Sequence, residues 1–337
     1  MARGGFADKV EWHTISAAAQ VDRSSRFLDP HGFDNPPEQN RQRAGCRVAG
    51  AAHMRRDWGD GNKWSEDRHW ADLSMYGKSE LRDDYQITAR SVAAMARDLP
   101  AGFHIPAHSH RRSQLIYGCT GAITVQTEDG TWIVPPHRGV WVPGGVEHQM
   151  TCSGSVQMRT VYIEPDARPF LPRQCVVLTV SNLLRELIIA AVKIPNDYAI
   201  ASREERVMDL ILDEIQPAAE LPLHLPMPKD RRLVKVCEYI LANPANDISL
   251  AALGAQCGAS RRTLERLFPQ DTGLSFTLWR QQARVLAAIR LLATGLPVTS
   301  VAMEVGYESP SAFSTMFRRV FGMPPSDYFN KPGELQE

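Results

Sequence analysis

Residues 253–268 read LGAQCGASRRTLERLF, and residues 301–317 read VAMEVGYESPSAFSTMF. The two stretches share one pattern, in which a small residue is followed four positions later by glycine and then by two apolar residues four positions apart. The first stretch has the small residue at Gly254 and the glycine at Gly258, and the equivalent residues stand 48 positions further on. Such a repeat indicates one supersecondary unit that is used twice.

Each unit carries the signals of a helix-turn-helix. The small residue, which is Ala302 in the second unit, lets the second helix pack closely on the first. Gly258 and Gly306 permit the left-handed turn between the two helices. Ser260 and Ser309 follow as predicted N-caps. Both second helices are therefore expected to have a defined start.

The two faces of each second helix differ in chemistry. The apolar faces have the spacing of a buried stripe: Leu264, Leu267 and Phe268 in the first unit, and Phe313, Met316, Phe317 and Val320 in the second. The predicted DNA-binding residues are Arg261, Arg262, Thr263 and Arg266, and Ser311, Ser314, Thr315 and Arg318. Arginine can bond guanine through two hydrogen bonds, and hydroxyl groups can reach bases or phosphates in the major groove. Any solvated helix face can look like this, but the capped repeat favours DNA binding.

The length and composition suit a soluble protein of two domains. The chain has 337 residues, of which 43% are apolar and 23% charged. Its six cysteines form no C-x-x-C pair, which argues against a disulfide framework or a zinc knuckle. The sequence shows neither a secretory leader nor an apolar run long enough to span a bilayer, so we expect a cytoplasmic location.

The charge is unevenly distributed along the chain. The formal net charge is zero, but residues 229–329 contain 12 Lys or Arg against 8 Asp or Glu. This segment is therefore +4 and the remainder −4. The bias permits binding to nucleic acid without proving it.

The segments differ enough in sequence pattern to predict domain limits. We expect an unassigned, disordered N-terminal extension at residues 1–85, with Met75 as a candidate true start, because that stretch has no sustained period. The remaining limits are a cupin-like sensor barrel at 86–180, a helical region at 181–216 that is a candidate for dimerisation, a proline-rich linker at 217–228 and the DNA-binding domain at 229–330. The predicted strands are 114–117, 123–126, 131–134, 140–142 and 158–163. The predicted helices are 181–192, 203–216, 231–241, 249–257, 260–269, 275–294, 298–305 and 310–321.

The run GLSFTLWRQQARVLAAIRLLATGLPVTSVAMEVGYESPSAFSTMFRRVFGMPPSDYF, residues 273–329, closely resembles the signature of the AraC/XylS family of transcription regulators. With the first unit the resemblance covers about 100 residues. It implies two recognition helices that enter adjacent segments of the major groove. Two positions depart from the family pattern: Gly254 replaces the usual alanine, and Phe329 stands where an arginine is common.

The sensor half contains a group of histidines. Residues 102–121 read GFHIPAHSHRRSQLIYGCTG, which places His108, His110 and Gln114 on or beside one strand, with both histidines pointing the same way. A third imidazole, His148, follows a turn that contains Pro143-x-Gly145. We expect these four side chains to meet at the mouth of a barrel.

The same residues resemble the two cupin motifs. Gln114 takes the place of the usual glutamate, His137 stands where glycine is expected, and Cys152 where asparagine is common. The set could hold a divalent metal ion, bind an organic effector without metal, or stabilise the barrel mouth, and these alternatives stay open. Neither His104 nor His137 stands at a ligand position of the motifs, and both are left out of the predicted site.

These features predict a two-domain α+β protein, in which a cupin-like antiparallel β-barrel is followed by an all-α tandem helix-turn-helix domain. The predicted function is a sequence-specific transcription regulator that binds double-stranded operator DNA and a small-molecule effector, with a homodimer as the candidate assembly. The alternative is a metal-dependent cupin enzyme with an accessory DNA-binding domain. We predict that the protein is not an enzyme, because the sequence offers no further acid/base or nucleophile group with motif support.

Overall fold

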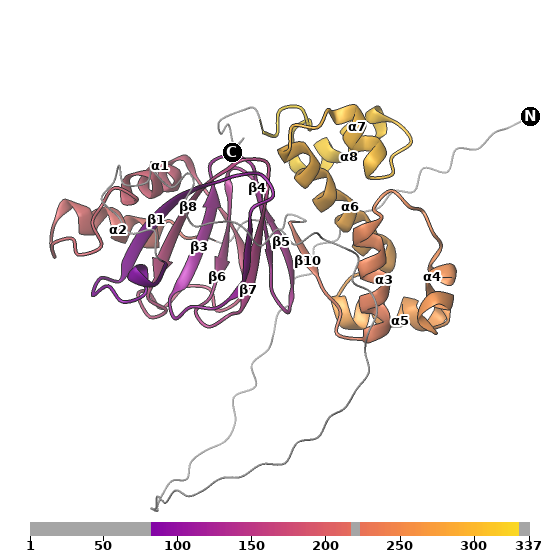
Figure 1. Cartoon of the computed structure of the whole chain (residues 1–337), viewed down its shortest axis with the longest axis horizontal. Helices are drawn as coiled ribbons and strands as arrows, with labels where there is room; N and C mark the ends of the chain where they lie inside the picture. The colour runs from indigo at the N-terminus through magenta and orange to yellow at the C-terminus, as the bar shows by residue number, and fades with distance from the viewer. Residues whose placement is uncertain (1–81, 217–222, 330–337) are drawn as a thin grey trace, which may run out of the picture. The chain divides into compact units, whose positions relative to one another are not determined.

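The computed structural model describes residues 82–216 and 223–329 of the chain (Figure 1). Most of the predicted N-terminal extension, including Met75, lies outside the described residues, as does the first half of the predicted linker. None of the described helices combines the length and hydropathy needed to cross a membrane.

The sensor half consists of two five-stranded antiparallel sheets (Figure 1). The first sheet has the order β1 (Val92–Leu99), β8 (Val156–Ile163), β3 (Ser113–Gly118), β6 (Arg138–Val142) and β9 (Val176–Thr179). The second has the order β10 (His224–Pro226), β5 (Gly130–Val134), β4 (Ala122–Gln126), β7 (His148–Ser153) and β2 (His104–His108). The five predicted strands correspond to β3, β4, β5, β6 and β8, and the predicted antiparallel barrel-like fold is confirmed.

The two sheets enclose one apolar core. Alternate residues of β7 are buried, as expected for a strand with one face on a core. Side chains from both sheets fill the space between them, among them Ile116, Ile123, Val125, Trp132, Val140, Val142, Met150 and Met158. The core also includes Tyr85, from a short 3-10 helix at Arg82–Tyr85, whose ring lies 5.9 Å from that of Tyr162. The barrel therefore starts earlier than the predicted limit at residue 86.

Two helices cover the outer face of the first sheet. They are α1 (Asn182–Ala191) and α2 (Arg203–Asp213), capped by the hydroxyls of Ser181 and Ser202. Their apolar residues pack with Leu115, Trp141 and other outward-facing side chains of the sheet. Most of the apolar residues of the predicted dimerisation region, 181–216, are thus buried against the barrel.

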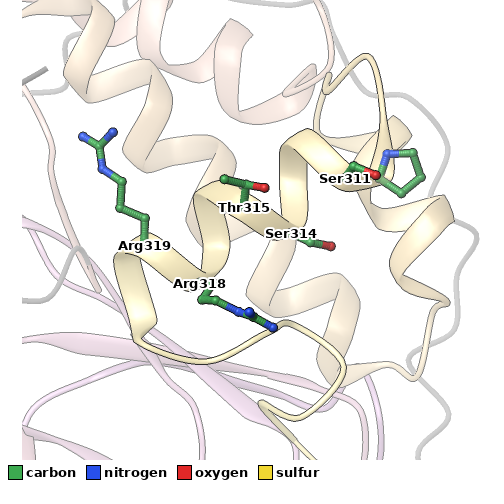
Figure 2. Close-up of a pocket in the computed structure, with 6 residues that line it drawn as sticks. Ser311, Ser314, Thr315, Arg318 and Arg319 are labelled. Carbon is green, nitrogen blue, oxygen red and sulfur yellow. The ribbon is translucent and has the colours of Figure 1, made fainter. Parts of the chain in front are cut away.

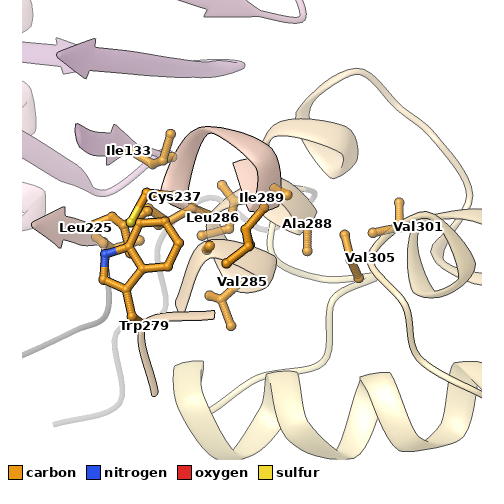
Figure 3. Close-up of a cluster of buried hydrophobic side chains, with 14 of the residues drawn as sticks. Ile133, Leu225, Cys237, Trp279, Val285, Leu286, Ala288, Ile289, Val301 and Val305 are labelled. Carbon is orange, nitrogen blue, oxygen red and sulfur yellow. The ribbon is translucent and has the colours of Figure 1, made fainter. Parts of the chain in front are cut away.

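The C-terminal half is entirely helical. Its helices are α3 (Arg231–Ala242), α4 (Leu250–Cys257), α5 (Arg261–Thr272), α6 (Phe276–Ala293), α7 (Val298–Glu304) and α8 (Pro310–Phe321). Each corresponds to a predicted helix, with ends that differ by at most a few residues. Figure 3 shows the indole of Trp279 in α6 beside Cys237 and Leu225, within a core that extends along α6 to Val301 and Val305.

The second half of the predicted linker is ordered rather than a plain connector. Strand β10 pairs antiparallel with β5, and the His224 ring stacks on Trp132 with centroids 4.4 Å apart. Proline is tolerated here because β10 is an edge strand, where Pro226 need not donate to a neighbour. Leu223 and Leu225 are buried with side chains of the helical half. The prolines of the linker therefore excluded a helix and a central strand, but not an edge strand.

Candidate functional site

The first helix-turn-helix unit comprises α4 and α5. Gly258 ends α4 in the left-handed region at φ 71°, as predicted. The Ser260 hydroxyl accepts a 3.1 Å hydrogen bond from the backbone N–H of Thr263, which confirms the predicted N-cap of α5. At Gly254 a Cβ atom would lie 2.4 Å from the carbonyl oxygen of Ala259. The departure from the family's alanine therefore coincides with a close approach of the turn.

The second unit, α7 and α8, repeats this geometry. Gly306 has φ 79°, and the N–H of the next residue bonds the Ala302 carbonyl oxygen at 2.9 Å. The Ser309 hydroxyl accepts from the N–H of Ala312 at 3.2 Å, and Pro310 occupies the first helical position. The predicted turn glycine and N-cap are both confirmed.

The outer face of α5 is basic and exposed. Arg261, Arg262 and Arg266 are all exposed, whereas Leu264 and Phe268 on the opposite face are completely buried. Arg261 forms an ion pair of 2.7 Å with Glu265, and Arg266 donates to the side chain of Gln270 at 2.8 Å. The Thr263 hydroxyl lies 2.9 Å from that of Ser260, so it belongs to the helix cap as well as to the outer face.

The outer face of α8 carries small hydroxyl residues and two arginines (Figure 2). Ser311, Thr315 and Arg318 are exposed, and Ser314 is partly buried. With Pro310 and Arg319 they line a concavity of about 660 Å³. Figure 2 shows Arg318 and Arg319 extending in different directions from the helix, with Ser314 on the side of Arg318.

A single long helix joins the two units. Helix α6 has 18 residues, which corresponds to a length of about 27 Å. Eight of its residues are buried, including Trp279 and Ile289, so packing holds it along its length. The structure thus places α5 and α8 at the two ends of a well-packed connector.

The four predicted sensor residues come together, although not in the way that the sequence predicted. His108 is the last residue of β2, His110 lies in the connection after it, and Gln114 is in β3, which belongs to the other sheet. The expectation that His108, His110 and Gln114 lie on or beside one strand is therefore wrong. They converge because the chain crosses between the sheets at this point, and because His108 is the register partner of His148.

The histidine cluster, defined here as His108, His110 and His148, is compact. The His148 ring centroid lies 4.4 Å from that of His108 and 5.0 Å from that of His110. His110 and His148 are buried, and His108 is partly buried. The potential ligand nitrogens of the three rings lie within 4.8 Å of one another.

Backbone carbonyl groups orient the rings of the cluster. The Nδ1 atoms of His108, His110 and His148 contact the carbonyl oxygens of Pro106 at 2.8 Å, Arg112 at 2.6 Å and Val146 at 3.0 Å, respectively. The Nε2 atoms of His110 and His148 lie 3.0 and 3.2 Å from Oε1 of Gln114. Gln114 is almost completely buried, so its amide forms the floor of the cluster.

Sequence reasoning missed two residues that hold Gln114 in place. Its Nε2 donates to the Thr160 hydroxyl at 2.8 Å and to the Tyr162 hydroxyl at 3.3 Å, and both partners come from β8. The period of two within residues 158–163 places them on one face, but only the pairing of Gln114 with Tyr162 brings that face to the amide. His104, which was left out of the site, contacts Thr151 instead.

A second missed feature is an acidic cavity beside the cluster. It measures about 560 Å³, and its lining includes His148 together with Glu128, Asp129 and Glu147. All three carboxylates are exposed. They come from two separate turns, so no local sequence pattern joins them.

Comparison with known proteins agrees with both halves of the structure. Residues 92–215 match the family model of an AraC-like ligand binding domain, and residues 253–331 match that of a helix-turn-helix domain. The HTH-type transcriptional regulator NimR of Escherichia coli K12 is 36% identical over 250 residues, which cover 72% of this chain and 90% of NimR. The chain belongs to the AraC family. The arabinose operon regulatory protein of E. coli K12 matches this AraC-family regulator at 32% identity over 108 residues, covering 32% of this chain and 36% of that protein.

Among solved structures, wild-type ToxT from Vibrio cholerae aligns with 74% of this chain and 99% of its own, with 12% identity and a TM-score of 0.32. The named relatives of this AraC-family protein are transcription regulators. The enzyme alternative has no support, and the protein combines a DNA-binding domain with a domain of the ligand-binding type.

Proposed function

We propose that this AraC-family regulator reads its operator with α5 and α8. The proposed contacts are Arg261, Arg262, Thr263 and Arg266 in α5, and Ser311, Ser314, Thr315 and Arg318 in α8. The observation that carries the proposal is the repeated geometry: each helix is capped by serine, buries its aromatic side and exposes its polar side. The +4 charge of residues 229–329 supports contact with phosphates.

The connector predicts the form of the operator. Because α6 is packed along its length, α5 and α8 should enter two successive segments of the major groove, about 34 Å or one helical turn apart. One protomer should therefore recognise a bipartite site. We further propose that the protein acts in the cytoplasm, where its double-stranded DNA is found.

We also propose that the protein works as a homodimer through the helical pair α1 and α2. Leu183 and Leu210 support this, because they remain 52% and 45% exposed although their neighbours are buried against the barrel. The patch is small, so we expect a modest interface that operator binding strengthens. Sedimentation analysis with and without operator measures the oligomeric state, and a monomer in both would contradict the proposal.

The effector site is proposed at the histidine cluster and Gln114. It is a largely buried polar group between the two sheets, next to a cavity, and such places commonly bind small ligands. An effector bound there must favour one conformation of the protein if it is to alter DNA binding. A reporter gene under the operator, screened against a panel of small metabolites, should respond in the wild type and lose its response in the His110→Ala variant. The His104→Ala variant should keep it.

Selection of bound sequences from random duplex DNA tests the proposed function as a whole. The full chain should enrich a bipartite site, and a double variant, Arg262→Ala with Arg318→Ala, should enrich none. Enrichment of a single short half-site would contradict the use of both helices. Failure of the wild-type chain to enrich any sequence would overturn specific DNA binding by this chain.

A further inference from the structure

We propose that His108, His110 and His148, together with Gln114, bind one divalent transition metal ion. The regulatory meaning of this ion rests on the proposed effector site, but the argument for binding depends only on the geometry of the four side chains. The three rings come from two neighbouring strands and the connection after β2, and the amide comes from the opposite sheet. The fold therefore brings four ligands together from separate segments.

The spacing of the cluster suits a single ion. The ligand nitrogens lie within 4.8 Å of one another. In tetrahedral coordination, two imidazole nitrogens that each lie about 2.0–2.1 Å from a zinc ion are about 3.4 Å apart. Rotation of the rings toward one another would close the set around a metal ion.

The tautomers of the rings place the lone pairs of His110 and His148 on the nitrogens that face Gln114. Each Nδ1 contacts a backbone carbonyl oxygen, which can only accept a hydrogen bond, so each Nδ1 must carry a proton. In a neutral imidazole the lone pair is then on Nε2. Carbonyl groups fix metal-binding histidines in this same manner, by holding the nitrogen that does not bind the ion.

The amide of Gln114 adds another lone pair at the same point. The Thr160 hydroxyl donates its single proton to the Leu115 carbonyl oxygen at 3.0 Å, so its oxygen accepts from Nε2 of Gln114. This fixes the direction of the amide, and Oε1 must face His110 and His148 at 3.0 and 3.2 Å. With neutral rings these contacts join acceptor to acceptor, which is repulsive at that distance. A positive charge between them removes the repulsion.

The chemistry of the ligands indicates the class of ion. Three imidazole nitrogens and one amide oxygen suit Zn²⁺, Co²⁺, Ni²⁺ or Cu²⁺, whereas Mg²⁺ and Ca²⁺ prefer sets made of oxygen. The ligand set is uncharged, so the ion would keep its full charge. The neighbouring carboxylates Glu128, Asp129 and Glu147 favour a cation there. The described residues that line the cavity include no lysine or arginine.

The metal would also give the effector a point of attachment. Three or four protein ligands leave a position open for a further donor. An effector that carries a nitrogen or oxygen lone pair can bind there without any cationic side chain. The positive charge between Gln114 and the rings can come from a metal ion or from a proton on one of the buried rings. The experiment must distinguish these two cases.

Titration of the full chain with Co²⁺ distinguishes these cases. We expect uptake of about one ion per chain, with the visible absorption bands of four- or five-coordinate Co²⁺. The variants His108→Ala, His110→Ala and His148→Ala should each weaken binding by at least about 100-fold, since loss of an outer-shell partner alone often costs 10–100-fold. The matched control is His104→Ala, on the same strand as His108, which should bind as the wild type does.

Cysteine substitution identifies the ligands directly. A His148→Cys variant that binds Co²⁺ should gain a sulfur-to-cobalt charge-transfer band, and a His104→Cys variant should not. Because a histidine variant can fail to fold, Gln114→Glu provides a second test: a carboxylate next to the ion should tighten binding by at least tenfold. Unfolding curves establish that each variant is folded.

Two results would overturn the proposal. One is the absence of stoichiometric Co²⁺ uptake by the folded wild type, which would leave a ring proton as the source of charge. The other is uptake that survives replacement of the three histidines. Operator binding measured on the same samples keeps this outcome separate from the proposed function: a metal-free protein that still selects its operator would refute only the metal, and a metal-binding protein that selects none would refute only the regulator.

Discussion

The indole Nε1 of Trp279, near the start of α6, donates a 2.8 Å hydrogen bond to the carbonyl oxygen of Pro226 in β10. Strand β10 pairs in turn with β5, so this bond joins the connector helix to the edge of the sensor sheet. The side chain of Gln282 in α6 also donates to a carbonyl of β10, at His224. A short strand thus contacts both the sheet and the helix that holds the two DNA-binding units.

The variant Trp279→Phe should lower stability locally in the helical half. It keeps an aromatic side chain in the core but leaves the Pro226 carbonyl without its partner, which costs about 1–3 kcal/mol. Hydrogen exchange should accelerate in α3, α5 and α6. The matched control is Trp141→Phe, which removes an equivalent 2.8 Å bond to Pro172 inside the sensor half and should accelerate exchange in β6 and β9. Identical exchange patterns in the two variants would contradict separate roles.

Arg262→Ala should reduce sequence discrimination more than general affinity. If the guanidinium reaches a guanine edge, its loss costs about 1–3 kcal/mol at particular base pairs. Affinities for the selected operator and for single-base variants of it measure the effect. Arg203→Ala removes an exposed arginine from α2 in the sensor half and should change nothing. Equal weakening on every sequence would make Arg262 a phosphate contact instead.

Arg318→Ala tests contact with the DNA backbone by α8. The affinity of the wild type for DNA should fall steeply as the salt concentration rises, because the cationic side chains of the protein displace counterions from the phosphates. Removal of one phosphate contact should reduce the slope of log affinity against log salt by about 1. An unchanged slope, together with a loss at one base pair only, would assign Arg318 to base recognition.

Stability should fall between pH 7 and pH 5 because of His224. Burial lowers the pKa of this imidazole to about 4, against the opposing effect of the Asp129 carboxylate. In the unfolded chain its pKa is about 6.5, so over this range the unfolded state binds more protons than the folded state. The contribution of the neutral His224 side chain to the free energy of unfolding is therefore fully present above about pH 6.5 and is lost as the pH falls towards 4. At pH 5 about 2 kcal/mol of this contribution has been lost.

Denaturant unfolding of the wild type and of His224→Gln, each at pH 7 and pH 5, measures this contribution. Between pH 7 and pH 5 the free energy of unfolding of the variant should fall by about 2 kcal/mol less than that of the wild type, whatever the absolute stability of the variant. His104→Gln is the control and should keep the full pH dependence. The same dependence in His224→Gln as in the wild type would show that another group is responsible.

The helix-turn-helix units could be predicted from sequence because their determinants are local. Gly258 and Gly306 supply turns with positive φ, and Ser260 and Ser309 bond N–H groups three residues ahead. The apolar stripe of each second helix follows from the 3.6-residue period alone. All of these interactions act within a few residues, so the order of residues was sufficient to predict them.

Only the tertiary structure decided how the histidine cluster and Gln114 come together. His108, His110 and Gln114 were expected on or beside one strand, but Gln114 lies in a different sheet from His108, and cross-strand pairing brings His148 and Tyr162 to them. Likewise β10 forms inside a predicted linker because the edge of β5 offers a partner and the helical half buries Leu223 and Leu225. Strand pairing and burial join residues that lie far apart in the chain, and a local sequence pattern does not identify such partners. The sequence by itself therefore determined the helix-turn-helix units and predicted the residues of the histidine cluster, whereas the packing of the sheets determined which atoms face one another.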